Sequence, residues 1–202
     1  MAGKDLADID YSERTPGHVA VKEVVPPFEN LPGVDPLLGP EMQSTGEVMG
    51  IAGSFDRAFY KAQLAAGNEL PESGNVMLSV RDADKDAIVP IAQELEESGL
   101  ELLCTDGTAD YLESRGVKLK RINKISQGSP DVLDRIEEID LIINTPTEGG
   151  KPHRDGFKIR RAAVDLNIPY ITDLQAAHAA VRAIKNSKKE GLTVKTLEEY
   201  QG

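Results

Sequence analysis

The sequence has few of the features that mark secreted or membrane-bound proteins. Its 202 residues include a single cysteine, Cys104, so an internal disulfide is excluded and an inert thiol buried in an apolar strand is expected. No stretch reaches the roughly 20 apolar residues of a membrane-spanning helix. The acidic start MAGKDLADID also lacks the charged and then apolar pattern of a signal peptide. We therefore expect a cytoplasmic protein with no membrane partner.

Motifs for metals and nucleotides are missing as well. The chain has no zinc or calcium loop, Walker loop, nucleophile elbow or GxGxxG, and His18 and His153 have no second metal ligand at a usable spacing. The net charge is −11, from 23 Lys+Arg against 34 Asp+Glu, which disfavours nucleic acid as a partner. These features favour a small-molecule role without a metal site.

Hydrophobic patterning divides the chain near residue 70. Apolar runs at 75–80, 100–105, 117–124, 139–145 and 168–172 alternate with helical patterns, including helices expected over about 107–115 and 130–138. This alternation predicts an α/β fold over 75–202, with a doubly wound five-stranded parallel sheet. Residues 1–70 offer only a strand at 18–28, further strand-like alternation and one amphipathic helix through Phe55 and Phe59. These elements are too few to close a core and are expected to be the edge of a larger unit.

Polar side chains follow each predicted strand of this sheet, and in an open parallel sheet ligands bind outside the carboxyl ends of the strands. The residues are Lys85 after the first strand, Thr105 and Thr108 after the second, Lys124 at the end of the third, Asn144, Thr145 and Thr147 after the fourth, and Thr172 after the fifth. Lysines, hydroxyls and a helix N-terminus at Gly107 together suit a phosphate group.

Each of these residues also has a purely structural interpretation. Thr105 and Thr108 could cap the following helix, Lys85 could be a solvated residue of a first helical turn, and Asn144 could start an ordinary turn with Thr145 and Pro146. The carboxylates at the same edge, Asp106, Asp131 and Asp173, could be helix caps or general bases.

The stretch VKEVVPPFENLPGVDPLLGPEMQSTGEVMG, followed by F..AF.KAQL, resembles the closing segment of the second ATP-grasp unit in the large subunit of carbamoyl phosphate synthases. The rest of the chain is similar to the C-terminal regulatory domain of that subunit, which has the methylglyoxal-synthase-like fold. The resemblance implies an ATP-grasp remnant over 1–70 and an allosteric domain over 75–202. It also implies that the chain is a fragment or a split gene product.

The resemblance further implies a regulatory role without catalytic residues or a cofactor on this chain. The parent enzyme would be an ATP-dependent ligase that uses Mg²⁺ or Mn²⁺ and K⁺. It would make carbamoyl phosphate from bicarbonate and glutamine-derived ammonia for pyrimidine and arginine synthesis. Implied protein partners are the upstream ATP-grasp units and a small glutaminase subunit, and a homo-oligomer is left open by the sequence.

Two effector sites are implied residue by residue. UMP or IMP would be held through the phosphate or ribose by Lys85, Thr105, Thr108 and Lys124, with Asn144 and either Thr145 or Thr147 completing the site. An ornithine-type effector would be held by Glu23, Leu38, Tyr170 and Thr172. Two departures from the family pattern are Gln43, where relatives usually carry a basic residue, and Gly156, which replaces a serine that contacts the nucleotide phosphate.

Two other functions remain open on the sequence. A lyase of the methylglyoxal synthase kind, acting on dihydroxyacetone phosphate, would need a carboxylate base after the third strand. The corresponding stretch SQGSPD offers only Asp131 in place of the lyase's G-G-D-Q pattern. The other alternative is an interaction module that binds no small ligand.

Overall fold

The computed structural model describes residues 3, 5, 15–38, 46–147 and 155–201. Its centre is a parallel sheet of five strands in the order β5-β4-β3-β6-β7. The strands are β3 (Asn75–Ser79), β4 (Glu101–Thr105), β5 (Lys120–Ile122), β6 (Leu141–Asn144) and β7 (Tyr170–Ile171). The predicted five-stranded parallel sheet is therefore confirmed. The chain turns in opposite directions from β3, so β3 and β6 flank the switch point where ligands bind in such sheets.

Helices cover both faces of the sheet because its strands are apolar on both sides. Val76 and Leu78 lie in one core with α2 (Lys85–Glu97), α3 (Asp106–Glu113) and α5 (Leu174–Glu190). Met77 lies in the other core with Ile159 of α4 (Asp155–Asp165). Cys104 is fully buried in the first core, as expected, and burial raises the pKa of its thiol to about 12, which disfavours the reactive thiolate.

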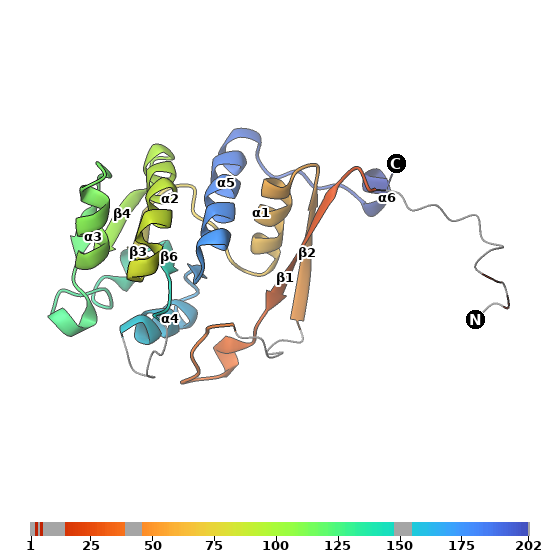
Figure 1. The fold of residues 1–202 in the computed structure, drawn as a ribbon. Helices are drawn as coiled ribbons and strands as arrows, with labels where there is room; N and C mark the ends of the chain where they lie inside the picture. The colour runs from red at the N-terminus through yellow and green to blue at the C-terminus, as the bar shows by residue number, and fades with distance from the viewer. Residues whose placement is uncertain (1–2, 4, 6–14, 39–45, 148–154, 202) are drawn as a thin grey trace.

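The N-terminal elements extend the first helical layer. Strands β1 (Val19–Val25) and β2 (Gly46–Ala52) form an antiparallel hairpin that packs on α1 (Phe55–Ala65). In turn α1 packs against α5, where Asp56 accepts hydrogen bonds from Arg182 at 3.1 Å and Asn186 at 2.8 Å. Figure 1 shows α3, α2, α5 and α1 side by side, with the hairpin beyond α1. Near the C-terminus, α6 (Leu197–Gln201) lies by this hairpin, where Tyr200 donates a hydrogen bond to the Ile51 carbonyl. The division into 1–70 and 75–202 and the ATP-grasp origin of the first part stay predictions.

The prediction of a helix over 130–138 is wrong. This stretch contains turns and only a short 3₁₀ helix, η5 (Ile136–Glu138). The Asp131 carboxylate accepts hydrogen bonds from the backbone N–H groups of Leu133 and Asp134, while Asp134 accepts one from the N–H of Asp131. These local bonds compete with helical hydrogen bonds for the same backbone groups. In the part of the chain that the structure describes, no helix is long and apolar enough to cross a bilayer.

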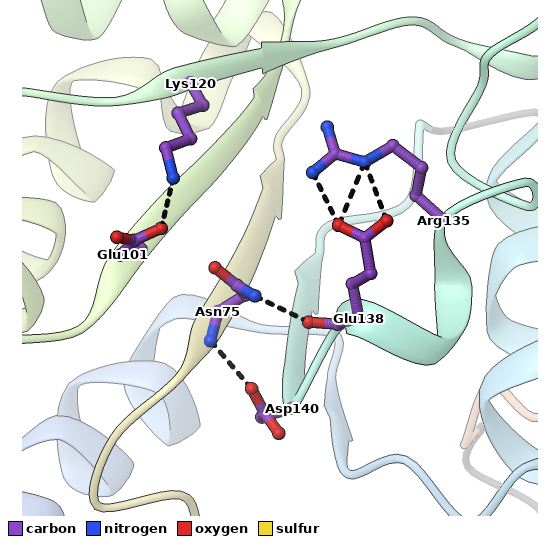
Figure 2. A network of polar contacts seen from close by, with 6 residues as sticks. All are labelled: Asn75, Glu101, Lys120, Arg135, Glu138 and Asp140. Atoms are coloured by element: carbon purple, nitrogen blue, oxygen red, sulfur yellow. Dashed lines mark hydrogen bonds and ion pairs between the residues drawn. The ribbon is translucent and has the colours of Figure 1, made fainter.

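Polar residues at the amino edge of the sheet pair with one another (Figure 2). Asn75 donates from its backbone N–H to Asp140 and from its side chain to the carbonyl of Glu138, each at 2.7 Å. Lys120 forms an ion pair with Glu101, and Arg135 forms one with Glu138. At this edge the polar side chains are therefore partnered by one another.

Candidate functional site

A cavity of about 520 Å³ opens at the carboxyl edge of the sheet, next to the switch point. Five of the seven residues predicted to bind a nucleotide line it, namely Thr105, Lys124, Asn144, Thr145 and Thr147. Thr108 and Lys85 lie beside the cavity without lining it. We call this space the anion cavity. The register of the strands explains the gathering, because Ser79 of β3 is paired with Asn144 of β6 at this edge.

The two threonines around Gly107 do not cap α3 with their side chains. Thr105 occupies the N-cap position, but its buried hydroxyl donates to the Ser79 hydroxyl at 3.1 Å. Thr108, also buried, accepts a hydrogen bond from the backbone N–H of Val80 at 3.2 Å. The capping interpretation is therefore wrong for both side chains. Their hydroxyls instead fix the end of β3 against β4 and α3.

Asn144 and Thr145 are structural parts of the same edge. The Asn144 amide donates to the Ser79 carbonyl at 3.0 Å, and the Thr145 hydroxyl accepts from the backbone N–H of Arg81 at 3.0 Å. Both side chains are buried, which is unlike an ordinary solvated turn, whereas Thr147 is exposed at the rim. Thr145 and Thr147 both line the cavity, so the choice between them stays open.

Arg160 of α4 is a cavity residue that sequence reasoning missed. Its side chain is only 5% exposed and donates to the Asn144 side-chain oxygen at 2.7 Å. It also makes a two-pronged ion pair with Asp35, at 2.9 and 2.7 Å. A Cβ on Gly156 would lie 3.1 Å from both the guanidinium and the Asn144 oxygen, so the glycine makes room for this contact.

The charges around the anion cavity favour a negatively charged ligand. Arg81, Lys124 and Arg160 line it, against the carboxylates of Asp35 and Asp155. Helices α3 and α4 both begin at the cavity, and their N-termini carry partial positive charge.

Lys85 lies next to this charge cluster and is not simply solvated. Its ammonium forms an ion pair with Asp82 at 2.7 Å, and its side chain is 20% exposed. The contact with Lys85 lowers the pKa of the Asp82 carboxyl. A Cβ on Gly107 would lie 3.6 Å from the ammonium, so Lys85 is close to the start of α3.

A second cavity of about 260 Å³ lies between the hairpin, α4 and β7, and all four residues predicted for an ornithine-type effector line it: Glu23, Leu38, Tyr170 and Thr172. We call it the acidic cavity, because its lining also includes Glu29 and Asp173 and, among the described residues, no lysine or arginine.

Burial raises the pKa of two side chains in the acidic cavity, Glu23 and Tyr170. It raises the pKa of the Glu23 carboxyl, an effect that a hydrogen bond with Gln63 partly offsets. It also raises the pKa of Tyr170 to about 12, and the phenol donates to the Pro36 carbonyl at 3.0 Å. An ionised Glu23 in such a site favours a cationic partner.

The three carboxylates predicted as helix caps or general bases at the carboxyl edge of the sheet make local hydrogen bonds. Asp173 caps α5 by accepting hydrogen bonds from the N–H groups of Gln175 and Ala176, as the capping interpretation predicted. Asp106 accepts a hydrogen bond from Gln127, and Asp131 is held in its own turn and is not part of the anion cavity lining. Within the described residues, no cluster of three or more His, Cys, Asp or Glu side chains is arranged for a metal. Gln43 lies outside the described residues.

Comparison with known proteins identifies relatives along almost the whole chain. Residues 87–172 match the model of the MGS-like domain. The carbamoyl phosphate synthase large chain of Methanosarcina acetivorans is 54% identical over 99% of this chain and 19% of its own length. The C-terminal section of that large chain from Methanopyrus kandleri is 56% identical over 96% of this chain and 36% of its own length. The chain thus spans about a fifth to a third of these two relatives. A solved methylglyoxal synthase from Elizabethkingia anophelis NUHP1 matches 55% of this chain and 79% of its own, with 25% identity and a TM-score of 0.45.

Proposed function

Because the chain belongs to the family of carbamoyl phosphate synthase large chains, we propose that it is the regulatory part of such an enzyme, binding a nucleoside monophosphate in the anion cavity. The observation that carries this proposal is the gathering of Thr105, Lys124, Asn144, Thr145 and Thr147 around one cavity at the switch point. The parent activity would be ATP-dependent synthesis of carbamoyl phosphate in the cytoplasm, with the upstream ATP-grasp units and a small glutaminase subunit as partners. ATP, Mg²⁺ or Mn²⁺ and K⁺ would bind to the upstream ATP-grasp units and not to this chain.

The anion cavity suits the phosphate of a nucleotide by its charge. Lys124 supplies a point charge, and the starts of α3 and α4 supply backbone N–H groups. Regulation would follow if the nucleotide bound two arrangements of this domain and the upstream units with different affinity. In that scheme the residues described here bind and orient the effector, and catalysis takes place elsewhere in the enzyme.

Isothermal titration calorimetry of the 202-residue chain with UMP and IMP tests this function. We expect saturable binding of at least one nucleotide and none of uridine or inosine, which have the same bases without the phosphate. No heat with either nucleotide at millimolar concentration would overturn the proposal. Phosphate release from dihydroxyacetone phosphate above background would instead favour the lyase, for which Asp131 is poorly placed.

The acidic cavity would take ornithine, with Glu23 opposite its positive charge. Because burial raises the pKa of Glu23 above its usual value of 4.5, the cavity by itself disfavours the ionised form that a cation needs. Cation binding lowers this pKa and releases a proton. We therefore expect ornithine affinity to rise with pH up to the raised pKa of Glu23 and to level off above it.

Calorimetry over a pH series, in buffers of different ionisation enthalpy, measures both the affinity and the released proton. Glu23→Gln is expected to weaken binding and to remove this pH dependence, because its amide does not titrate. Glu29→Gln, which changes another carboxylate of the same cavity, is the matched variant and should keep the pH dependence. A pH profile that persists unchanged in Glu23→Gln would contradict the assignment.

A further inference from the structure

Four consecutive residues of the chain form a wall shared by the two cavities. Asp35 and Leu37 line the anion cavity, whereas Pro36 and Leu38 line the acidic cavity. This alternation is that of an extended segment, whose successive side chains point to opposite sides. We call residues 35–38 the strap. In Figure 1 the segment that follows β1, drawn in orange, lies close to α4.

Two side chains hold the strap, one from each cavity. On the anion side, the Asp35 carboxylate pairs with Nε and Nη2 of the buried Arg160. On the acidic side, the Tyr170 hydroxyl donates to the Pro36 carbonyl. Loss of either contact, Asp35 with Arg160 or Tyr170 with Pro36, is therefore expected to move atoms that line both cavities.

The pair between Asp35 and Arg160 places a carboxylate where an incoming anion would bind. Arginine presents two parallel N–H donors in one plane, and these can bind either a carboxylate or a phosphate through two hydrogen bonds. Here Asp35 occupies these donors within the anion cavity, and its own side chain is 34% exposed while that of Arg160 is 5% exposed. The exposed partner is the one that can leave, because its carboxylate can be solvated by water.

We propose that the strap is a switch in which Asp35 occupies the anion-binding edge of Arg160 until a phosphorylated ligand displaces it, and that this displacement loosens the wall of the acidic cavity. The inference rests on the proposed function, because it takes a nucleoside monophosphate as the ligand. The Nε and Nη2 edge of Arg160 holds either Asp35 or the ligand, so the strap has two arrangements that the two cavities favour differently. Nucleotide binding therefore weakens ornithine binding, and by linkage ornithine weakens nucleotide binding by the same factor.

The test is calorimetry of each ligand alone and in the presence of the other, on the wild-type chain and on Asp35→Asn. In the wild type we expect each ligand to lower the affinity of the other by about five-fold or more. The substitution keeps the shape of the side chain but removes the charge that binds Arg160. We expect it to raise nucleotide affinity by about five-fold, to lower ornithine affinity, and to reduce the coupling to less than about two-fold.

The matched control is Asp165→Asn, which removes an ion pair with the neighbouring Arg161 on the same helix but touches neither cavity. It should leave both affinities and their coupling unchanged. A second readout is amide hydrogen exchange in residues 31–38, which we expect to become faster when nucleotide binds.

The outcomes separate the two proposals. If neither nucleotide binds the wild-type chain, the proposed function fails and the switch with it. If a nucleotide binds but Asp35→Asn keeps wild-type affinity and coupling, or exchange in the strap slows on binding, only the switch is overturned.

Discussion

Replacing Gly50 with alanine is expected to lower the free energy of unfolding by about 3 kcal/mol, at the upper end of the usual cost of overpacking. A Cβ at this position would lie 2.1 Å from the carbonyl oxygen of Ala58 and 2.5 Å from the backbone nitrogen of Ala62. Both atoms belong to the backbone of α1, so no side-chain rotation relieves the overlap. The hairpin and the helix must therefore move apart.

Gly53→Ala provides the control, since Gly53 lies just after β2 and a Cβ there would meet nothing within 4 Å. We expect its stability to be unchanged or raised by up to about 1 kcal/mol. Urea denaturation of both variants measures the difference. Equal stabilities of the two variants would show that β2 does not pack on α1 as closely as described.

The same substitution links the fold to the acidic cavity. Gly50 is paired with Val21 of β1, the strand that carries Glu23. Separation of the hairpin from α1 would therefore displace Glu23 from Gln63, whose hydrogen bond partly offsets the raised pKa of the carboxyl. We expect Gly50→Ala to bind ornithine more weakly than Gly53→Ala does.

The sheet could be predicted because its strands are buried on both faces, which makes them short continuous apolar runs. Leu141, Ile142 and Ile143 are all fully buried and show this pattern directly. The prediction of a helix over 130–138 is wrong because the apolar spacing there suits a helix, while Asp131 and Asp134 direct the backbone into turns through their own hydrogen bonds. Periodicity reports which residues are buried and not which local hydrogen bonds prevail.

The anion cavity could be predicted in part for a similar reason. The carboxyl ends of parallel strands meet at one edge, so residues such as Thr105 and Asn144 could be grouped without knowing the strand order. The contact between Arg160 and Asp35 could not be predicted in this way. It joins residues 125 positions apart and depends on how the segment after β1 packs on α4. The sequence also could not predict which groups the Thr105 and Thr108 hydroxyls contact. Threonines that cap a helix would stand at the same positions, so the residue types alone do not distinguish the two roles.

Replacing Lys124 with alanine is expected to reduce nucleotide affinity by about ten-fold or more, because a hydrogen bond to a charged group contributes about 1.5–3 kcal/mol. Lys124 lines the anion cavity just after the end of β5, and we assign its ammonium to the phosphate. Lys85→Ala should have a smaller effect, since Lys85 lies beside the cavity and already has Asp82 as a partner. Calorimetric titration with UMP and IMP measures both variants.

Lys120→Ala is the matched control for this prediction. Lys120 is an exposed lysine at the other end of the same strand, where it pairs with Glu101 at the amino edge of the sheet (Figure 2). Its removal changes the net charge of the chain by the same amount as Lys124→Ala but leaves the anion cavity intact. Nucleotide affinity should therefore stay within about two-fold of the wild type, because exposed ion pairs contribute little. If the two lysine variants lost affinity equally, the effect would come from overall charge, and Lys124 would have no specific contact with the phosphate.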